Sequence, residues 1–228
     1  MRKSRKEQQF QPKLDFENKY TCAGYKNICG CDEAGRGPLA GPVVCASCIM
    51  PLNDIVEGVD DSKKLSEKKR KLLFEEIKNK AIAYNIVFID EKTIDEINIL
   101  NATKKGMQQA INGLSIKPDF ALIDAVKGLD LVCECEPIIK GDALSYSIGC
   151  ASILAKVARD EFMQQLDIKY PDYGFAVHKG YGTKKHMEKL FDIGPCDAHR
   201  RTFLKFLENK WATMLVFGRR EKVLLFNF

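Results

Sequence analysis

The chain has 228 residues, of which 45% are hydrophobic, so it is long enough to bury a core and is not a disordered polymer. Lysine and arginine outnumber aspartate and glutamate by 36 to 31, and the net charge of +5 permits a polyanionic partner without identifying one. No apolar run approaches the roughly 20 residues that cross a bilayer, so no membrane partner is expected.

Cysteine usage indicates a reducing environment. The chain has nine cysteines, an odd number, and its first residues (MRKSRKEQQF) lack the apolar core of a secretory signal peptide. Cys133 and Cys135 form a C-x-C pair, but no second pair follows at zinc-finger spacing. We therefore expect free thiols, no cysteine-bound metal and a cytoplasmic location.

The first third of the chain predicts a tail followed by a pair of strands. Residues 1–20 are basic and polar and are expected to form a flexible tail, with order beginning near Leu14. Two short segments rich in Val, Ile and Cys, at 27–35 and 42–50, predict strands. The turn-forming "GRGPLAG" between them favours a hairpin-like pair.

A helix and a third strand are predicted next. Residues 66–81 have helical spacing, with Ser66 as a candidate N-cap. The apolar face of this helix is expected to contain Leu72, Leu73 and Ile77. Residues 81–89 (AIAYNIVFI) then read as a strand.

The middle of the chain repeats this strand-and-helix theme. Residues 98–114 are amphipathic, and 119–125 and 136–142 predict short strands. A long helix is predicted at 147–170, where small and apolar residues recur at helical spacing: Ile148, Ala151, Leu154, Ala155, Ala158 and Phe162. The pattern indicates an α/β fold.

Helical segments at 184–191 and 198–215 complete the chain. There is no internal repeat and no low-complexity linker. We therefore predict one domain at 21–210 that includes a helical C-terminal region, followed by a tail at 211–228.

Four acidic residues lie at the expected ends of strands. Asp32 and Glu33 end the first strand, Asp124 ends "ALID", and Asp142 follows "PIIKG". Ligands of open α/β sheets bind beyond strand ends, so these carboxylates could converge on one point. A cluster of oxygen ligands without His or Cys suits Mg²⁺ or Mn²⁺. The alternative is that each acid is an ordinary strand-end or turn residue.

The glycines next to these acids predict a close backbone approach. Gly35 and Gly37 flank Arg36, and a residue without a Cβ lets the backbone N–H and C=O groups reach a ligand. A tight turn with a solvated arginine would show the same pattern.

Seven blocks follow one another from Asp32 to Phe203. They are "DEAGRGPLAGPVV", "DDSKKLSEKKR", "INILNATKKGMQQAI", "ALIDA", "IIKGDALSYSIGCASILAKVARD", "YPDYGFAVHKGYGTKKHMEKL" and "HRRTF". In order and spacing they resemble the blocks of bacterial-type ribonuclease HII, the type 2 ribonuclease H. Several long blocks in register make this resemblance specific, although one block alone would be only suggestive.

The resemblance implies a ribonuclease H-like fold: a mixed five-stranded sheet flanked by helices, with a helical C-terminal region beside the substrate cleft. It also implies hydrolysis of the phosphodiester on the 5′ side of ribonucleotides, within RNA–DNA hybrids or singly embedded in duplex DNA. The products would be a 3′-hydroxyl and a 5′-phosphate, and the enzyme would support removal of misincorporated ribonucleotides during DNA replication and repair.

Carried over by motif, the catalytic and metal-binding carboxylates would be Asp32, Glu33, Asp124 and Asp142. They would hold two Mn²⁺ or Mg²⁺ ions, one activating the attacking water and one stabilising the leaving 3′ oxygen. Asp32 is the best candidate to bridge both ions.

The resemblance also implies substrate-binding residues. Gly35, Arg36 and Gly37 would read the ribose 2′-hydroxyl, and Tyr181 would pack on the adjacent sugar. Lys63 and Lys64 are candidate phosphate contacts, although a lysine pair in a loop is often simply solvated.

Four further residues receive structural interpretations. Asp160 is read as a structural helix residue because "KGD" favours Asp142. His178, His186 and His199 lack metal-ligand spacing and are interpreted as surface or packing residues, with a substrate-side role left open for His178.

Three alternatives are weighed. A type 3 ribonuclease H would carry an N-terminal domain for which about thirty residues before Asp32 leave no room. A non-catalytic nucleic-acid-binding protein of the same fold would be expected to lack some carboxylates. A phosphatase acting on small molecules would not account for the GRG turn, Tyr181 and the lysines together.

The chain ends in "GRREKVLLFNF". Its "VLLF" has the leucine-then-phenylalanine pattern of peptides that dock into bacterial sliding clamps, but the usual leading glutamine is absent. A clamp partner is a hypothesis, and the alternative is a tail that packs on the helical region or is disordered.

Overall fold

The computed structural model describes residues 13–60 and 62–207. Its five strands are β1 (Ile28–Ala34), β2 (Val43–Ile49), β3 (Ala83–Ile89), β4 (Phe120–Asp124) and β5 (Glu134–Ile138). They form one sheet in the order β3-β2-β1-β4-β5. The β1–β2 and β2–β3 pairs are antiparallel, whereas β1–β4 and β4–β5 are parallel. The predicted mixed five-stranded sheet and its hairpin-like first pair are thus confirmed.

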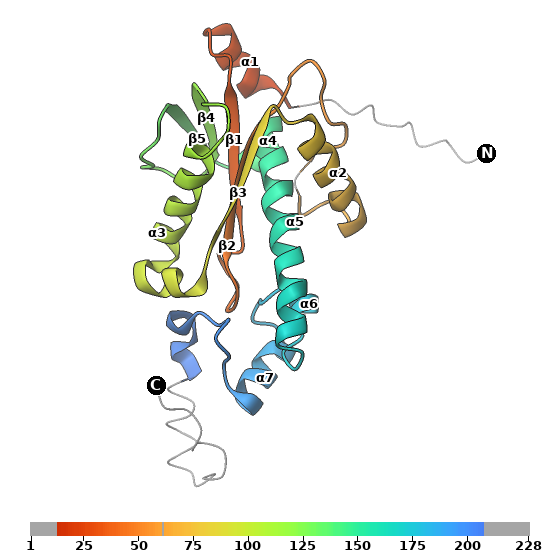
Figure 1. Cartoon of the computed structure of the whole chain (residues 1–228), viewed down its shortest axis with the longest axis vertical. Helices are drawn as coiled ribbons and strands as arrows, with labels where there is room; N and C mark the ends of the chain where they lie inside the picture. Colours follow the sequence, from red (N-terminus) through yellow and green to blue (C-terminus); the bar gives the residue numbers. More distant parts are fainter. Residues whose placement is uncertain (1–12, 61, 208–228) are drawn as a thin grey trace, which may run out of the picture.

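Helices cover both faces of this sheet (Figure 1). They are α1 (Asp15–Cys22), α2 (Glu67–Lys80), α3 (Glu91–Asn112), α4 (Gly141–Leu144), α5 (Tyr146–Lys169), α6 (Phe175–His178), α7 (Lys184–Ile193) and a 3₁₀ helix (Arg201–Leu204). In Figure 1, α3 lies on one side of the strands and α5 on the other, with α2 outside α5. α6, α7 and the 3₁₀ helix extend the molecule beyond one end of the sheet, as the expected helical C-terminal region.

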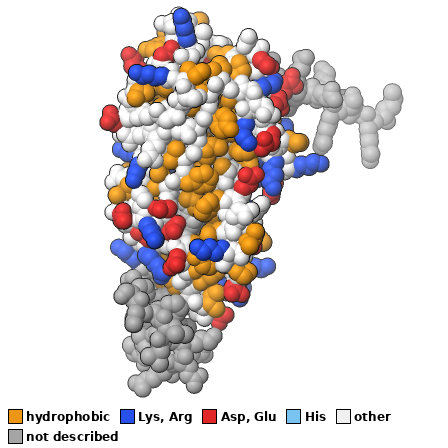
Figure 2. Space-filling model, in the orientation of Figure 1, with side chains coloured by type: hydrophobic (Ala, Val, Ile, Leu, Met, Phe, Trp, Pro, Cys, Tyr) orange, Lys and Arg blue, Asp and Glu red, His pale blue; other side chains and the backbone are white. Residues whose placement is uncertain are grey.

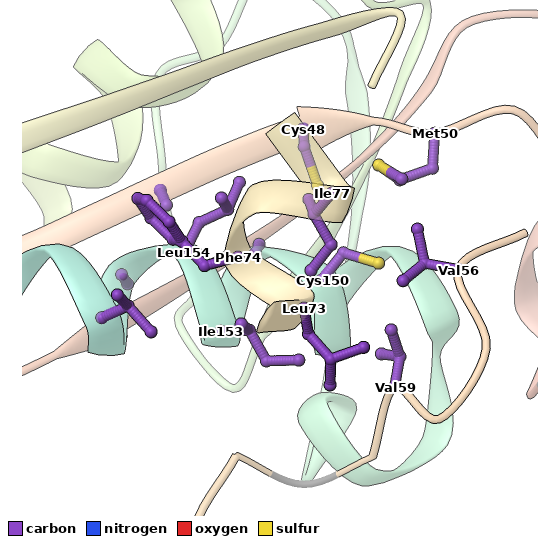
Figure 3. Packing of buried hydrophobic residues seen from close by; sticks show 14 of the residues in the cluster. Cys48, Met50, Val56, Val59, Leu73, Phe74, Ile77, Cys150, Ile153 and Leu154 are labelled. Atoms are coloured by element: carbon purple, nitrogen blue, oxygen red, sulfur yellow. The ribbon is translucent and has the colours of Figure 1, made fainter. Parts of the chain in front are cut away.

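One core lies between α5, α2 and the sheet (Figure 3). α2 begins at its predicted N-cap, where the Lys69 N–H donates to Ser66 Oγ at 3.3 Å. Its buried residues are Leu73, Phe74 and Ile77. The prediction for Leu72 is wrong: this side chain is 65% exposed because the buried face passes through Phe74 instead.

The second core lies between α3 and the opposite face of the sheet, with Met107 and Ile111 of α3 packed against Cys31 of β1. α3 begins at Glu91, seven residues before the predicted segment at 98–114. Asn98, at φ 64°, interrupts the helix, so the predicted segment corresponds to the part that follows this break.

The N-terminal boundary predicted at residue 20 is wrong, whereas order near Leu14 agrees with the structure. α1 spans Asp15–Cys22, so it begins inside the predicted tail and ends two residues beyond it. Its buried Glu17 accepts hydrogen bonds from Ser145 Oγ at 2.6 Å and the Ser147 N–H at 2.9 Å, which ties α1 to the start of α5. The folded unit therefore includes α1.

Two later elements also differ from expectation. The strand predicted at 136–142 is β5, Glu134–Ile138, so Asp142 belongs to α4 rather than to a strand end. The helix predicted at 198–215 starts as the 3₁₀ helix Arg201–Leu204, and residues beyond 207, including the tail predicted at 211–228, lie outside the described residues. In α5, Phe162 is 39% exposed although the other predicted apolar positions are buried.

On the face seen in Figure 2, lysines and arginines alternate with acidic side chains around a central hydrophobic band. Its position matches the edge strand β3, whose Tyr84 and Phe88 are 39% and 45% exposed. Within the described ranges, no helix is long and apolar enough to span a bilayer.

Candidate active site

Two of the predicted carboxylates stand at the end of β1. Consecutive strand residues point to opposite faces. Asp32 is only 4% exposed and interacts with the Ser152 side chain of α5, and it accepts the Glu33 N–H at 2.7 Å. Glu33 is partly exposed, and its Oε1 lies 3.5 Å from Arg36 Nη1. The structure thus places the two acids on either side of one backbone.

The other two carboxylates come from β4 and α4. β4 is parallel to β1 with Cys31 opposite Ile123, so Asp124 ends its strand beside Asp32. Asp124 Oδ1 accepts the Gly141 N–H at 2.7 Å, which fixes the start of α4 against β4. Asp142, the next residue, is 7% exposed. A hydrogen bond to α4, rather than a third strand end, therefore brings Asp142 to the site.

Electrostatics couple these four acids. Burial raises the pKa of Asp32 well above its usual range, and the charges of Glu33 and Asp124 raise it further. Burial also raises the pKa of Glu33, opposed mainly by Arg36, and the pKa of Asp124, opposed mainly by the Gly141 N–H. Asp142 adds to the shift at Asp124. The site therefore concentrates like charges that repel one another.

The donor set fits a hard divalent cation. All four groups supply carboxylate oxygens, and Glu33 Oε2 is buried without a hydrogen-bond partner. A cation would neutralise the repulsion and give this oxygen a ligand. In the part of the chain that the structure describes, no three His, Cys, Asp or Glu side chains already form a group that could hold a metal. The carboxylates would have to change rotamer to share one.

The two glycines of the GRG turn have different surroundings. Gly35 has φ 94°, and a Cβ on it would lie 1.9 Å from Arg159 Nε. The absent side chain of Gly35 therefore leaves room for the Arg159 guanidinium. A Cβ on Gly37 would meet only Tyr181 Cε1, at 3.8 Å, so Gly37 is the glycine that leaves the backbone open beside Tyr181.

Two buried arginines at this turn were missed by sequence reasoning. Arg159 and Arg200 are 1% and 0% exposed. Burial lowers the pKa of Arg159 to about 10 and that of Arg200 to about 9. The signal available in the sequence was weak: Arg159 follows small and apolar residues of the 147–170 segment, and Arg200 is one of two arginines in "HRRTF".

Tyr181 lies beside the turn, on the loop between α6 and α7. Its side chain is 46% exposed, and the Arg159 guanidinium carbon lies 6.0 Å from its ring centroid. The Tyr181 carbonyl accepts a hydrogen bond from His186 Nδ1 at 2.9 Å. The backbone of Tyr181 is thereby held while its ring remains accessible.

That hydrogen bond is the end of a buried histidine chain. With its proton on Nδ1, His186 accepts from His199 Nε2 at 3.0 Å, and His199 Nδ1 accepts the Cys196 N–H, also at 3.0 Å. Burial lowers the pKa of His186 to about 4 and that of His199 to about 3, so both rings are neutral. The packing interpretation holds for burial but missed the hydrogen bonds that support Tyr181.

Three more residues singled out in the sequence are Lys63, Lys64 and Asp160. Lys63 Nζ lies 3.3 Å from Asp142 Oδ2 although its side chain is 81% exposed. Lys64 is exposed and forms no hydrogen bond or ion pair with the described residues, so the structure does not bring it to the acids. Asp160 is buried and pairs with Lys156 Nζ at 2.6 Å, in keeping with a structural role.

Comparison with known proteins identifies related sequences and folds. A family model described as Ribonuclease HII matches residues 29–213. The chain is 55% identical over 192 residues to the ribonuclease HII of Caldicellulosiruptor bescii, covering 84% of this chain and 93% of that protein. The structure of the present chain is similar to that of ribonuclease H2 from Pyrococcus horikoshii OT3, with TM-score 0.70 and 27% identity, covering 82% of this chain and 99% of that one. A chain of the PCNA:RNase HII complex from Archaeoglobus fulgidus gives TM-score 0.64 and 26% identity, covering 77% of this chain and 94% of that one.

Proposed function

Since the chain belongs to the ribonuclease HII family, it is a type 2 ribonuclease H acting on RNA–DNA hybrids, and we propose that it also cuts 5′ to a single ribonucleotide in duplex DNA. The cut would leave a 3′-hydroxyl and a 5′-phosphate. Such an activity would support the removal of ribonucleotides misincorporated into DNA.

The observation that carries this proposal is the short distance between the GRG turn and Tyr181. A Cβ on Gly37 would lie 3.8 Å from the Tyr181 ring, and the turn directly follows the acids of β1. One sugar at the scissile position can therefore be read by the turn, while the exposed ring packs on the next sugar. No second 2′-hydroxyl is needed.

Asp32, Glu33, Asp124 and Asp142 are the residues proposed to hold Mg²⁺ or Mn²⁺. The bound ions would lower the pKa of the attacking water and stabilise the leaving oxygen. Asp32 is the most buried of the four and feels the charges of both Glu33 and Asp124, which supports a bridging role for its carboxylate. Lys63, next to Asp142, would contact the phosphate from the solvent side.

Phosphate contacts outside the acid cluster are proposed for Arg36 and Lys64. Arg36 is exposed and contacts Glu33, so its guanidinium stands next to the acids. Lys64 is exposed in the turn that also contains Lys63. Binding through such contacts should weaken steeply with salt.

The test uses matched duplexes that carry zero, one or four consecutive ribonucleotides, incubated with Mg²⁺ or Mn²⁺. We expect a nick 5′ to the single ribonucleotide, none in the all-DNA duplex, and no cleavage in EDTA. Absence of a nick at the single ribonucleotide, with the four-ribonucleotide duplex cleaved, would refute the proposal.

The role of Tyr181 is tested in the same assay. Tyr181→Ala should lower cleavage at a single ribonucleotide more than cleavage within a long RNA–DNA hybrid, because only the former requires a deoxyribose beside the cut. Tyr181→Phe, which keeps the ring, should cleave both substrates almost normally. Equal losses on both substrates for Tyr181→Ala would contradict the assignment.

A sliding-clamp partner is a separate proposal, and its peptide, 223–228, lies outside the described residues. It is supported by the "VLLF" pattern and by the similarity to the archaeal PCNA complex. Deleting 223–228 should abolish capture of the chain by an immobilised bacterial clamp while hybrid cleavage is unchanged. Unchanged capture, or no capture of the full chain, would exclude this peptide.

A further inference from the structure

Arg159 and Arg200 donate hydrogen bonds almost entirely to one loop. Arg200 donates to the carbonyls of Gly35 at 2.6 Å, Arg36 at 2.9 Å and Gly41 at 2.9 Å. Arg159 donates to those of Pro42 at 3.0 Å, Ala40 at 3.2 Å and Lys179 at 3.0 Å. Neither guanidinium forms a salt bridge within the described ranges. We call these two side chains the arginine frame.

Burying a cation without a carboxylate partner is costly, because the charge loses its hydration. Six carbonyl dipoles compensate for that loss, and the five that belong to residues 35–42 do so only while this loop keeps its present shape. Core packing alone would favour apolar side chains at both positions. The arginine frame therefore fixes the direction of particular peptide groups.

Those directions bear on the GRG turn. In a trans peptide the C=O and N–H groups point in opposite directions, and the described residues contain no cis peptide. The carbonyls of Gly35 and Arg36 face Arg200, so the N–H groups of Arg36 and Gly37 point away from it. Neither N–H donates a hydrogen bond to another described residue. Two adjacent donors are thus left for a ligand.

We propose that Arg200 is the positioning residue for ribose recognition: by holding the Gly35 and Arg36 carbonyls inward, it presents the Arg36 and Gly37 N–H groups to the oxygen of the 2′-hydroxyl. Arg159 has a complementary role, because it joins the same loop to Lys179 and lies against the Tyr181 ring. It sets the spacing between the turn and Tyr181. This inference rests on the proposed function of the turn.

The test is a double-perturbation cycle on an RNA–DNA hybrid with one modified nucleotide at the scissile position. The scissile ribose carries either its 2′-hydroxyl or a 2′-fluorine, which is a poor hydrogen-bond acceptor. The protein is either unchanged or Arg200→Lys, which keeps the charge but loses the planar set of donors. The matched control is Arg201→Lys, at the exposed neighbouring position.

We expect fluorine to reduce kcat/KM of the unchanged protein by at least about tenfold, and to have little further effect in Arg200→Lys. Arg201→Lys should keep the full sensitivity to fluorine. If Arg200 served folding alone, Arg200→Lys would lower kcat/KM by the same factor on the hydroxyl and the fluorine substrate. A fluorine sensitivity in Arg200→Lys equal to that of the unchanged protein would therefore overturn the inference. Failure of the proposed function is recognised separately, because the unchanged protein would then be insensitive to fluorine.

A second measurement needs no variant. Amide NMR signals of Arg36 and Gly37 are followed while the unchanged chain is titrated in EDTA with a duplex containing one ribonucleotide, and with its all-DNA counterpart. Both signals should move downfield with the ribonucleotide duplex and less with DNA. The same shifts with both duplexes would overturn the inference, even where Arg200→Lys fails to fold.

Discussion

The acid cluster and the arginine frame bury charge in opposite ways. Asp32, Glu33 and Asp124 repel one another, and burial raises the pKa of all three. Arg159 and Arg200 instead donate all six of their observed hydrogen bonds to backbone carbonyls. The acid cluster therefore keeps uncompensated repulsion in the free protein, whereas the arginine frame is fully hydrogen-bonded there. Under the proposed function, the first region would gain a cation and the second would need no rearrangement.

The carboxylates and the buried histidines also respond to pH in opposite ways. A carboxyl whose folded pKa is raised contributes stability below its unfolded pKa and loses that contribution as pH rises through the folded pKa. A histidine whose folded pKa is lowered contributes stability above its unfolded pKa and loses it as pH falls. Lowering the pH therefore reduces the repulsion among the carboxylates, whereas it destabilises the folded state at the buried histidines His186 and His199.

The largest effect on cleavage is expected from substitutions in the acid cluster. Asp32→Asn and Asp124→Asn should each reduce hybrid cleavage by about 10³-fold or more, because charge stabilisation in the transition state is lost. Neither should lower the thermal midpoint measured in EDTA, because each removes a repelled charge. Asp172→Asn, at an exposed position, is the control. Loss of both activity and stability in Asp32→Asn would indicate a structural role instead.

The next largest effect is expected when alanine replaces one glycine of the turn, and it should differ between Gly35 and Gly37. Gly35→Ala should destabilise the protein by about 1–3 kcal/mol and impair cleavage, because φ is positive and Arg159 occupies the Cβ position. Gly37→Ala should leave the free energy of unfolding nearly unchanged, because a Cβ there meets nothing closer than 3.8 Å. Denaturant unfolding of both variants checks this difference, and equal destabilisation would contradict the packing described for Gly35.

The histidine chain predicts a smaller, pH-dependent effect. The pKa values of about 4 for His186 and about 3 for His199 lie below the ordinary value of 6.5. The free energy of unfolding should fall by up to about 1.4 kcal/mol per histidine for each pH unit below about 6.5. His199→Gln should reduce this slope. A slope equal to that of the unchanged protein would show that His199 is not buried as a neutral ring.

The smallest effect is expected at an exposed cation. Lys64 belongs to neither buried region, so Lys64→Gln should lower affinity for a hybrid duplex only modestly. The slope of log affinity against log salt should become shallower by about 1, as expected for one lost phosphate contact. Lys71→Gln, on the exposed side of α2, should leave the slope unchanged. An unaltered slope in Lys64→Gln would remove Lys64 from the nucleic-acid surface.

Local patterns predicted the individual strands because short apolar segments between turn residues mark β1, β2 and β4, whereas the mixed five-stranded sheet was implied by the family resemblance. Asp142 was identified by motif, but its route to the site depends on the hydrogen bond from Gly141 to Asp124, which no local pattern encodes. The arginine frame was missed for the same reason. Arg200 and Gly35 are 165 positions apart, and a buried arginine in the sequence looks like an exposed one until its partners are known.

The most direct test of the central claim, that the four carboxylates form one cation-binding unit, is calorimetric titration with Mn²⁺ in two buffers of different ionisation enthalpy. The unchanged chain should bind Mn²⁺ and release protons, with greater release at about pH 5.5 than at about pH 8, because carboxyls with raised pKa must deprotonate first. Asp32→Asn should bind at least about tenfold more weakly and release fewer protons. Equal affinity and equal proton release in the two proteins would contradict the account.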